Sequence, residues 1–162
     1  MDMSFGKSFG FSLLTFMGLN FLFIIISAAV NNTLNQIFSV ITVQPLSIIL
    51  YLFVPIVYLP GNVITNLVSN FSSLNIANLL TNLGYLIAPL VGSLIAGNSS
   101  DNKGEAFGGW FLTAIVSMVA LLVLFFIASP SEITLIGTII GGVVNGLFYS
   151  CFALLIYRES FY

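Results

Sequence analysis

Few side chains in this sequence could do chemistry, and the densest group of charges lies between residues 101 and 105. The chain has three Lys or Arg, five Asp or Glu, one Cys and no His. Asp101, Asn102 and Glu105 offer oxygen ligands to a hard cation, but a Ca²⁺ site takes about six to eight oxygens, which this segment cannot supply. Capping of a helix that begins near Ala106 is the simpler interpretation. We therefore expect no metal site.

The residues that other kinds of active site require are also missing. A serine nucleophile needs a base, metal-dependent hydrolysis needs His or clustered carboxylates, and a nucleotide site needs a glycine-rich loop that ends in Lys. Gly104, Gly108 and Gly109 lie near Lys103, but without the spacing of a phosphate-binding loop. Cys151 has no second cysteine with which to form an internal disulfide. The sequence predicts no catalytic residue and no cofactor, although a structural lipid is compatible with it.

The overall composition indicates an integral membrane protein. Of the 162 residues, 59% are hydrophobic and only 5% are charged, and the mean hydropathy is +1.14. Soluble domains carry about 25% charged residues, because a chain of this length must cover a wet surface. Three scattered cations also cannot neutralise a phosphate backbone, so nucleic acid is excluded as a partner.

Four apolar runs are long enough to cross a bilayer as helices. They cover residues 9–30, 76–97, 106–128 and 133–157. A rise of about 1.5 Å per residue lets each run span a hydrocarbon core of about 30 Å. Lys7 precedes the first run, as in a signal peptide, but the run is too long for one, so we expect a retained helix.

The connection between the last two runs has the pattern of a capping box. Ser129 would be the N-cap, Pro130 the first helical residue and Glu132 the third. A connection this short predicts two antiparallel helices. A plain loop of turn-forming residues is the alternative interpretation.

Residues 37–59 form a fifth apolar run that is interrupted. Pro45 and Pro55 each remove a hydrogen bond from a helical ladder. We favour an all-α fold of four transmembrane helices in which this segment is re-entrant or lies on the membrane surface. Five spans with an external N-terminus are the alternative.

The positions of the cations support four spans. With four spans, Lys7, Lys103 and Arg158 all lie on one side, which the positive-inside rule identifies as cytoplasmic. We therefore expect the C-terminus and the loop at residues 98–105 to face the cytoplasm. The expected location is the cell membrane of a prokaryote.

Residues 62–74 predict an amphipathic helix without a single charge. Apolar residues gather on one face at helical spacing, and amide and hydroxyl residues occupy the other. Lipid-binding surface helices usually carry Lys or Arg, so we expect this helix to lie flat on the outer surface or against a partner. The alternative is that its polar face lines a water-filled path.

Rows of small residues predict close helix packing. In the run at residues 76–97, small residues recur at every fourth position and form one row. Two neighbouring rows of the same kind lie within the last span. Lipid provides no hydrophobic drive for helix association, so such grooves hold helices together through close contact. The rows consist of Gly84, Ala88, Gly92 and Ala96, then of Gly137, Gly141 and Asn145, and of Gly142, Gly146 and Ser150.

Two further expectations concern polar and aromatic residues within the spans. Asn145 is the most polar side chain of the last span, with Gln44 as its counterpart in the broken segment. An amide in hydrocarbon seeks a partner, so we interpret Asn145 as a structural contact between helices, with lining of a polar path as the alternative. Trp110, Tyr149 and Tyr157 are expected to anchor the membrane interfaces.

Two functions remain open. The first is a non-catalytic structural or accessory subunit that packs against other integral membrane subunits or against copies of itself, in contact with membrane lipid. The alternative is a channel or carrier for a small neutral solute, lined by Asn, Ser and Thr, with the prolines breaking helices at the site. Coupling to protons or ions is disfavoured, because no apolar run contains an ionisable carboxyl, amine or guanidinium.

Overall fold

The structure, a computed structural model, describes residues 3–128 and 131–157, and this part of the chain is entirely helical. Four of its helices are long and apolar enough to cross a bilayer, so the chain is an integral membrane protein, as its composition predicts. The elements are α1 (Met3–Val30), α2 (Leu34–Val43), α3 (Ser47–Phe53), the 3₁₀ helix η1 (Val54–Val57), α4 (Pro60–Ser72), α5 (Ile76–Asn98), α6 (Lys103–Ile127) and α7 (Glu132–Ile156).

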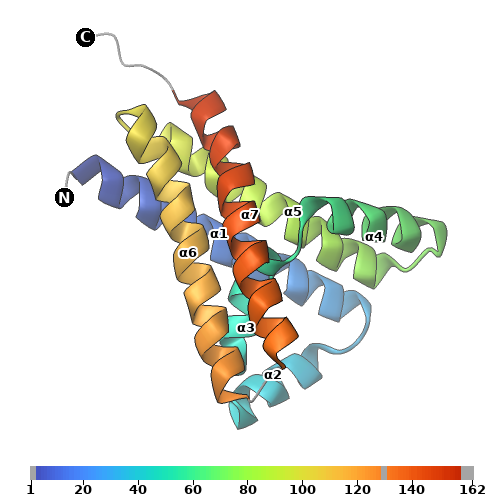
Figure 1. Cartoon of the computed structure of the whole chain (residues 1–162). Coiled ribbons are helices and arrows are strands. Elements are labelled where there is room, and N and C mark those ends of the chain that lie inside the picture. Colours follow the sequence, from blue (N-terminus) through green and yellow to red (C-terminus); the bar gives the residue numbers. More distant parts are fainter. Residues whose placement is uncertain (1–2, 129–130, 158–162) are drawn as a thin grey trace.

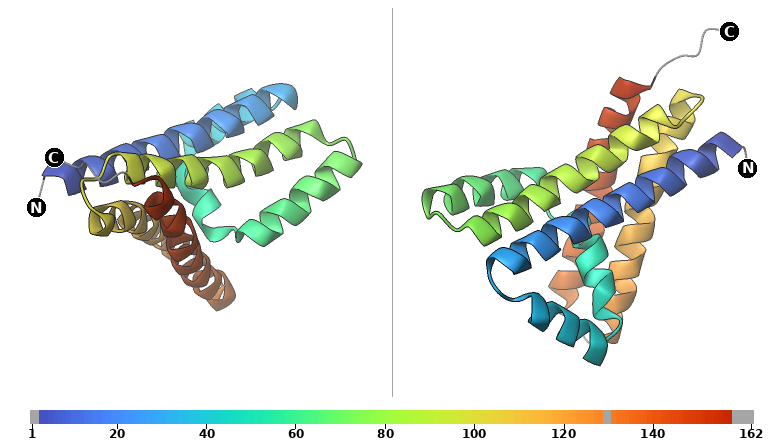
Figure 2. Two further views of the ribbon diagram at one scale, coloured as in Figure 1. Left: turned by 90° about the horizontal axis from the view of Figure 1, so that it is seen from above. Right: turned by 180° about the vertical axis from the view of Figure 1, so that it is seen from behind.

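The four long helices form two antiparallel pairs that cross each other. Helix α1 lies along α5, and α6 lies along α7 (Figure 1). The pairs come together where α1 begins, α5 ends and α7 ends, and they splay apart at the other end (Figure 2). Helices α3 and η1 fill the space between the splayed pairs, with contacts to α1, α5, α6 and α7.

Hydrogen bonds join three segments at the first of these ends, which we name the terminal end. The Ser4 hydroxyl donates to Glu105 Oε2 at 2.7 Å, and the Tyr157 hydroxyl donates to the Asp101 carbonyl at 3.0 Å. Asn102 caps α6 by accepting from the Glu105 amide at 2.9 Å, so the capping interpretation of this acidic segment is confirmed. Lys7 and Lys103 lie at this end as the four-span prediction requires, whereas Arg158 lies outside the described residues.

The cap of α7 differs from the predicted capping box. The helix begins at Glu132, and its N-cap is Ser131, whose hydroxyl accepts from the Thr134 amide at 3.3 Å. The cap therefore falls two residues later than predicted, because the Ser131 hydroxyl accepts from the amide of Thr134, three residues later. The predicted N-cap and first helical residue, Ser129 and Pro130, lie outside the described residues.

The segment between α1 and α5 enters and leaves the bundle at the same end. At the end opposite the terminal end, which we name the cavity end, the Ser27 hydroxyl donates to the Ala77 carbonyl at 2.7 Å. Thr81 donates to Ser27 Oγ at 2.8 Å. These bonds hold the last turns of α1 against the first turns of α5, so the chain between them begins and ends at the same end of the bundle.

The re-entrant segment consists of α3, η1 and α4. Helix α3 and η1 lead inward between the helix pairs, the chain then bends by 101°, and α4 leads back along α5 (Figure 1). Pro45 lies in the turn before α3, Pro55 in η1 and Pro60 in the first turn of α4. Pro45 and Pro55 interrupt the predicted apolar run at residues 37–59, whose first part belongs to α2 and whose remainder forms α3 and η1. Length and composition allow four spans, or five if the bent pair is counted as one, and the antiparallel contact of α1 with α5 favours four.

The predicted amphipathic helix forms as α4, but most of its apolar face is uncovered. Val63 is buried against α5, whereas Val68, Phe71 and Leu74 are exposed. On the polar face, Thr65 donates to the carbonyl of Gly61, one turn earlier in the same helix. The hydroxyls and amides of α4 thus bond mainly to their own backbone.

An aromatic cluster forms the core where the two helix pairs cross. Trp110 makes edge contacts with Phe16 and with Tyr149, at ring-centroid distances of 5.7 Å and 5.9 Å. Trp110 is 0% exposed and Tyr149 is 3% exposed. The prediction that these two residues anchor the membrane interface is wrong, because Gly92 leaves room for the Trp110 ring between the helices.

Candidate functional site

Two asparagines inside the bundle hold the re-entrant segment by its backbone. Asn20 Nδ2 in α1 donates to the Tyr51 carbonyl at 2.6 Å and to the Leu52 carbonyl at 3.3 Å. Both carbonyls belong to the last turn of α3, and Pro55, four residues after Tyr51, has no amide hydrogen to donate to the Tyr51 carbonyl. An unpaired carbonyl is costly in a dry bundle, so this amide stabilises the break.

Asn145 does the same for the inner end of the segment. Its Nδ2 donates to the Ile56 carbonyl at 2.6 Å and to the Tyr58 carbonyl at 2.9 Å. The structure thus places Asn145 in a contact between elements, as interpreted from the sequence. Its counterpart is Asn20 rather than Gln44, because Gln44 lies in the exposed turn that ends α2.

Sequence reasoning did not single out Asn20 as a contact. The available signal was an amide in the middle of an otherwise apolar span, which in hydrocarbon requires a partner. The amide oxygens of Asn20 and Asn145 are buried without a hydrogen-bond partner among the described residues. Both side chains therefore bond to the re-entrant segment through their amide nitrogens alone.

Gly141 allows η1 to approach α7 closely. A Cβ added at Gly141 would lie 2.6 Å from the Val57 carbonyl oxygen and 2.9 Å from Val57 Cα. Both neighbours are backbone atoms, so no side-chain rotation could make room. One helical turn later on α7, Asn145 donates to the same element, and the two residues together fix the position of η1.

The other members of the α7 rows face α6, with one exception. A Cβ at Gly142 would lie 2.7 Å from Met118 Cγ, and one at Gly146 would lie 3.2 Å from side chains of α6. Ser150 donates to the Phe107 carbonyl of α6 at 3.4 Å and to the Gly146 carbonyl of its own helix at 2.7 Å. The exception is Gly137, where a Cβ would have no neighbouring atom within 4 Å among the described residues, at the edge of a cavity.

The row of α5 faces α1 and α6 of the same chain. A Cβ at Gly84 would lie 2.5 Å from Phe23 Cβ, and one at Gly92 would lie 2.9 Å from Trp110 Cζ3. The neighbours that fill these grooves belong to this chain, so the rows position its own helices. The remaining members of the row are fully buried: Ala88 and Ala96.

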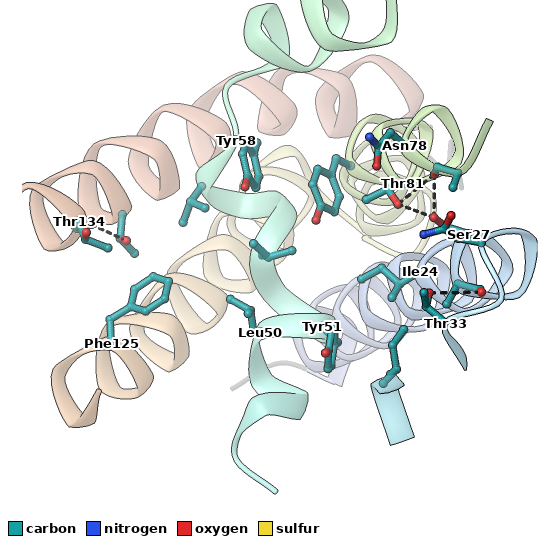
Figure 3. Close-up of a pocket in the computed structure, with 18 of the residues that line it drawn as sticks. Ile24, Ser27, Thr33, Leu50, Tyr51, Tyr58, Asn78, Thr81, Phe125 and Thr134 are labelled. Atoms are coloured by element: carbon teal, nitrogen blue, oxygen red, sulfur yellow. Dashed lines mark hydrogen bonds between the residues drawn. The ribbon is translucent and has the colours of Figure 1, made fainter. Parts of the chain in front are cut away.

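The re-entrant segment forms one wall of a cavity of about 640 Å³, which we name the main cavity. This volume lies within the range of about 300–1,000 Å³ that is usual for ligand sites. Figure 3 shows its lining side chains around the α3–η1 ribbon, with α1 and α5 on one side and α6 and α7 on the other. Its polar lining residues are Ser27, Asn31, Thr33, Tyr51, Tyr58, Asn78, Thr81, Tyr85, Thr134 and Thr138.

The lining of the main cavity is polar but uncharged. Hydroxyl and amide groups alternate with aliphatic side chains, and no Asp, Glu, Lys or Arg of the described residues contributes to it. Tyr58 and Tyr85 stack with their ring centroids 5.0 Å apart, which joins the end of η1 to α5. Such a lining can exchange hydrogen bonds with a polar molecule and can pack against its apolar faces.

The main cavity does not continue across the bundle. Toward the terminal end, the aromatic cluster and the re-entrant segment close it, and Phe16, Ile56 and Trp110 there are fully buried. The main cavity is therefore closed toward the terminal end. The polar face of α4, which the path-lining alternative required, contributes no residue to the lining.

Among the residues that the structure describes, no group of three His, Cys, Asp or Glu side chains lies close enough together to hold a metal ion. Comparison with protein-family models gave no match, and comparisons with curated proteins and with solved structures gave none either. The function must therefore be argued from the geometry of the main cavity.

Proposed function

We propose that this protein is a non-catalytic membrane protein that binds a small, uncharged, hydroxyl-bearing molecule in the main cavity. The observation that carries the proposal is the lining itself, which offers hydroxyl and amide groups from α1, α3, α5 and α7 around a volume of about 640 Å³. This is the neutral-solute alternative of the sequence analysis. The small-residue rows no longer favour assembly over binding, because helices of the same chain fill most of them.

The absence of charge in the lining selects for a neutral ligand. A charged group moved from water into a bundle needs an opposite charge or a dense set of hydrogen bonds, and its desolvation is otherwise costly. Hydroxyl groups of a ligand can instead donate to and accept from Ser, Thr, Tyr and Asn. Polyhydroxylated molecules therefore fit this lining better than carboxylates or amines do.

The closed core supports binding rather than an open channel. A route to the terminal end would pass through the ring contacts of Phe16, Trp110 and Tyr149 and through the re-entrant segment. Transport would require η1 to leave Asn145. The proposal is accordingly a binding site, with release toward the cavity end.

The orientation follows from the cations. Lys7 and Lys103 lie at the terminal end, and Arg158 comes directly after the last described residue. By the positive-inside rule the terminal end faces the cytoplasm, so the main cavity faces the outside of the cell membrane.

An accessory-subunit role is the second candidate, and the uncovered apolar surface of α2 and α4 favours it. No residue of α2 is buried, and Phe71 at the end of α4 is 72% exposed. Purification from the native membrane in mild detergent separates the two candidates. Larger subunits in fixed stoichiometry would support the accessory role, whereas a chain that purifies alone would support the binding role.

Removal of cavity hydroxyls is expected to weaken ligand binding without unfolding the protein. Thr138→Val and Tyr85→Phe each keep the shape of the side chain and remove one hydroxyl from the lining, and the Thr138 hydroxyl bonds only to the Thr134 carbonyl of its own helix. Each lost hydrogen bond should weaken binding by about three- to tenfold. Equilibrium dialysis of labelled methyl glucoside and glycerol against the protein in phosphatidylcholine nanodiscs measures this effect.

Thr42→Val is the matched control for these variants. The Thr42 hydroxyl bonds only to Phe38 of its own helix and does not line the main cavity, so the affinity should stay unchanged. Absence of saturable binding of both solutes, or equal losses in the control and cavity variants, would refute the proposed function.

A further inference from the structure

A second cavity of about 570 Å³ adjoins the main cavity at the cavity end. Leu50 of α3 and Phe125 of α6 line both, so these two side chains form the boundary between them. The rest of the second lining comes from the turn before α3 and from the last turns of α6. It is mainly aliphatic, in contrast to the hydroxyl-rich lining of the main cavity.

The second cavity meets the apolar outer surface of the bundle. Leu46 and Ile127 line it and are themselves exposed, on a part of the protein that a bilayer would cover. A hydrocarbon chain could therefore enter from the lipid without crossing water. Such a chain leaves a medium that is already apolar, so its gain in the second cavity comes from packing contacts rather than from removal from water.

One polar atom in the second cavity lacks a partner. Ser47 Oγ is buried and makes no hydrogen bond to any described residue. Ser47 lines the second cavity one helical turn before Leu50, hence close to the boundary. A buried hydroxyl without a partner is unusual, because it loses its bonds to water with no replacement. Rotation of the Ser47 side chain would turn this hydroxyl toward the second cavity, where a ligand with a polar linkage between head and chain would supply the missing acceptor.

We infer that the ligand is a lipid with an uncharged, hydroxyl-bearing headgroup. The headgroup occupies the main cavity, the linkage lies near Ser47, and part of a hydrocarbon chain occupies the second cavity. This inference rests on the proposed function and extends it from a small neutral molecule to a neutral lipid. An anionic phospholipid fits poorly, because no cationic side chain of the described residues lines either cavity.

The test uses the full chain in phosphatidylcholine nanodiscs, with bound lipid measured by native mass spectrometry. The probes are a monoglucosyl diacylglycerol, methyl glucoside as the headgroup alone, and phosphatidylglycerol as the anionic counterpart. We expect the glucolipid to bind at least about tenfold more tightly than either of the others. It exceeds methyl glucoside because its headgroup and chain occupy two linked sites, which raises affinity by about tenfold or more. It exceeds phosphatidylglycerol because the anionic headgroup would be buried without a cation.

Substitutions in the second cavity separate its contribution to lipid binding from that of the main cavity. Ala128→Trp narrows the second cavity at its exposed edge and leaves the main cavity untouched. It should weaken glucolipid binding by about tenfold through lost packing of the chain, and leave methyl glucoside binding unchanged. Ser47→Ala should weaken glucolipid binding by about threefold or more through the lost linkage bond. Ala29→Trp, at an exposed position of α1 outside both cavities, is the matched control.

The possible outcomes separate this inference from the proposed function. If methyl glucoside binds, but the glucolipid binds no more tightly and ignores Ala128→Trp, the lipid inference fails while the proposed function stands. Equal binding of phosphatidylglycerol and glucolipid would likewise overturn the neutral-lipid assignment. If neither methyl glucoside nor glucolipid binds, both fail together.

Discussion

Asn145→Leu is expected to lower the free energy of unfolding by about 2 to 3 kcal/mol. The substitution keeps the branching at Cγ and the number of side-chain heavy atoms, but removes the donor that serves the Ile56 and Tyr58 carbonyls. Individual hydrogen bonds between membrane helices contribute about 0.6 kcal/mol on average, but here two buried carbonyls lose their partner at once. Reversible unfolding in mixed micelles, followed by circular dichroism, measures the change.

Asn82→Leu is the matched control for this prediction. Asn82 Nδ2 donates only to the Asn78 carbonyl, one turn earlier in its own helix, so a change of less than about 0.5 kcal/mol is expected. If Asn145→Leu proved as mild as Asn82→Leu, the amide would not hold the re-entrant segment. Asn20→Leu should fall between the two, because its second bond is longer, at 3.3 Å.

Gly141→Leu is expected to displace η1 and to abolish ligand binding in the main cavity. A Cβ at this position would already lie 2.6 Å from the Val57 carbonyl oxygen, and backbone atoms cannot rotate away. Overpacking of this kind costs about 1 to 3 kcal/mol, and the better helix propensity of Leu over Gly offsets at most about 1 kcal/mol of it. Because Val57 and Tyr58 line the main cavity, a shift of η1 changes its shape directly.

Gly137→Leu, one turn earlier on α7, distinguishes displacement of η1 from simple filling of space. No described atom lies within 4 Å of a Cβ at Gly137, so the fold and its thermal stability should be retained, although the new side chain reaches into the main cavity. Loss of binding in both variants, with loss of stability only in Gly141→Leu, is the expected result. Equal thermal stability of the two variants would contradict the close approach of η1 to α7.

The four spans and the break between them could be predicted from the sequence, because they depend on local properties. Apolar length determined the long helices, and Pro45 and Pro55 marked where the fifth run departs from a helix. The return of the chain to the same end could only be inferred from the few cations. In the structure it is shown directly by the bond between Ser27 and Ala77.

The partners of the predicted packing residues could not be read from the sequence. A row of small residues indicates that something approaches closely, but its spacing is the same for a neighbouring helix of the chain and for a second subunit. Gly92 faces Trp110, and Gly141 faces the backbone of η1. The position of Trp110 near the start of its helix favoured a membrane-interface anchor, yet packing placed the ring in the core.

The main cavity could not be predicted from the sequence either, because its lining depends on how the helices pack. Its hydroxyls come one or two at a time from separate helices, such as Ser27 near the end of α1 and Thr138 near the start of α7. Each alone is an ordinary polar residue of a transmembrane helix. Only the wedge of α3 and η1 between the helix pairs brings them around one volume.

The most direct test is the sidedness of the two ends of the chain segment between α1 and α5. Single cysteines replace Asn35, Ser73 and Asn98 in turn, in a Cys151→Ser background, and sealed vesicles are treated with a membrane-impermeant maleimide. The structure predicts that positions 35 and 73 react from the same face of the membrane and position 98 from the opposite face. Reaction of positions 35 and 73 from opposite faces would mean that the segment crosses the bilayer, which contradicts the account.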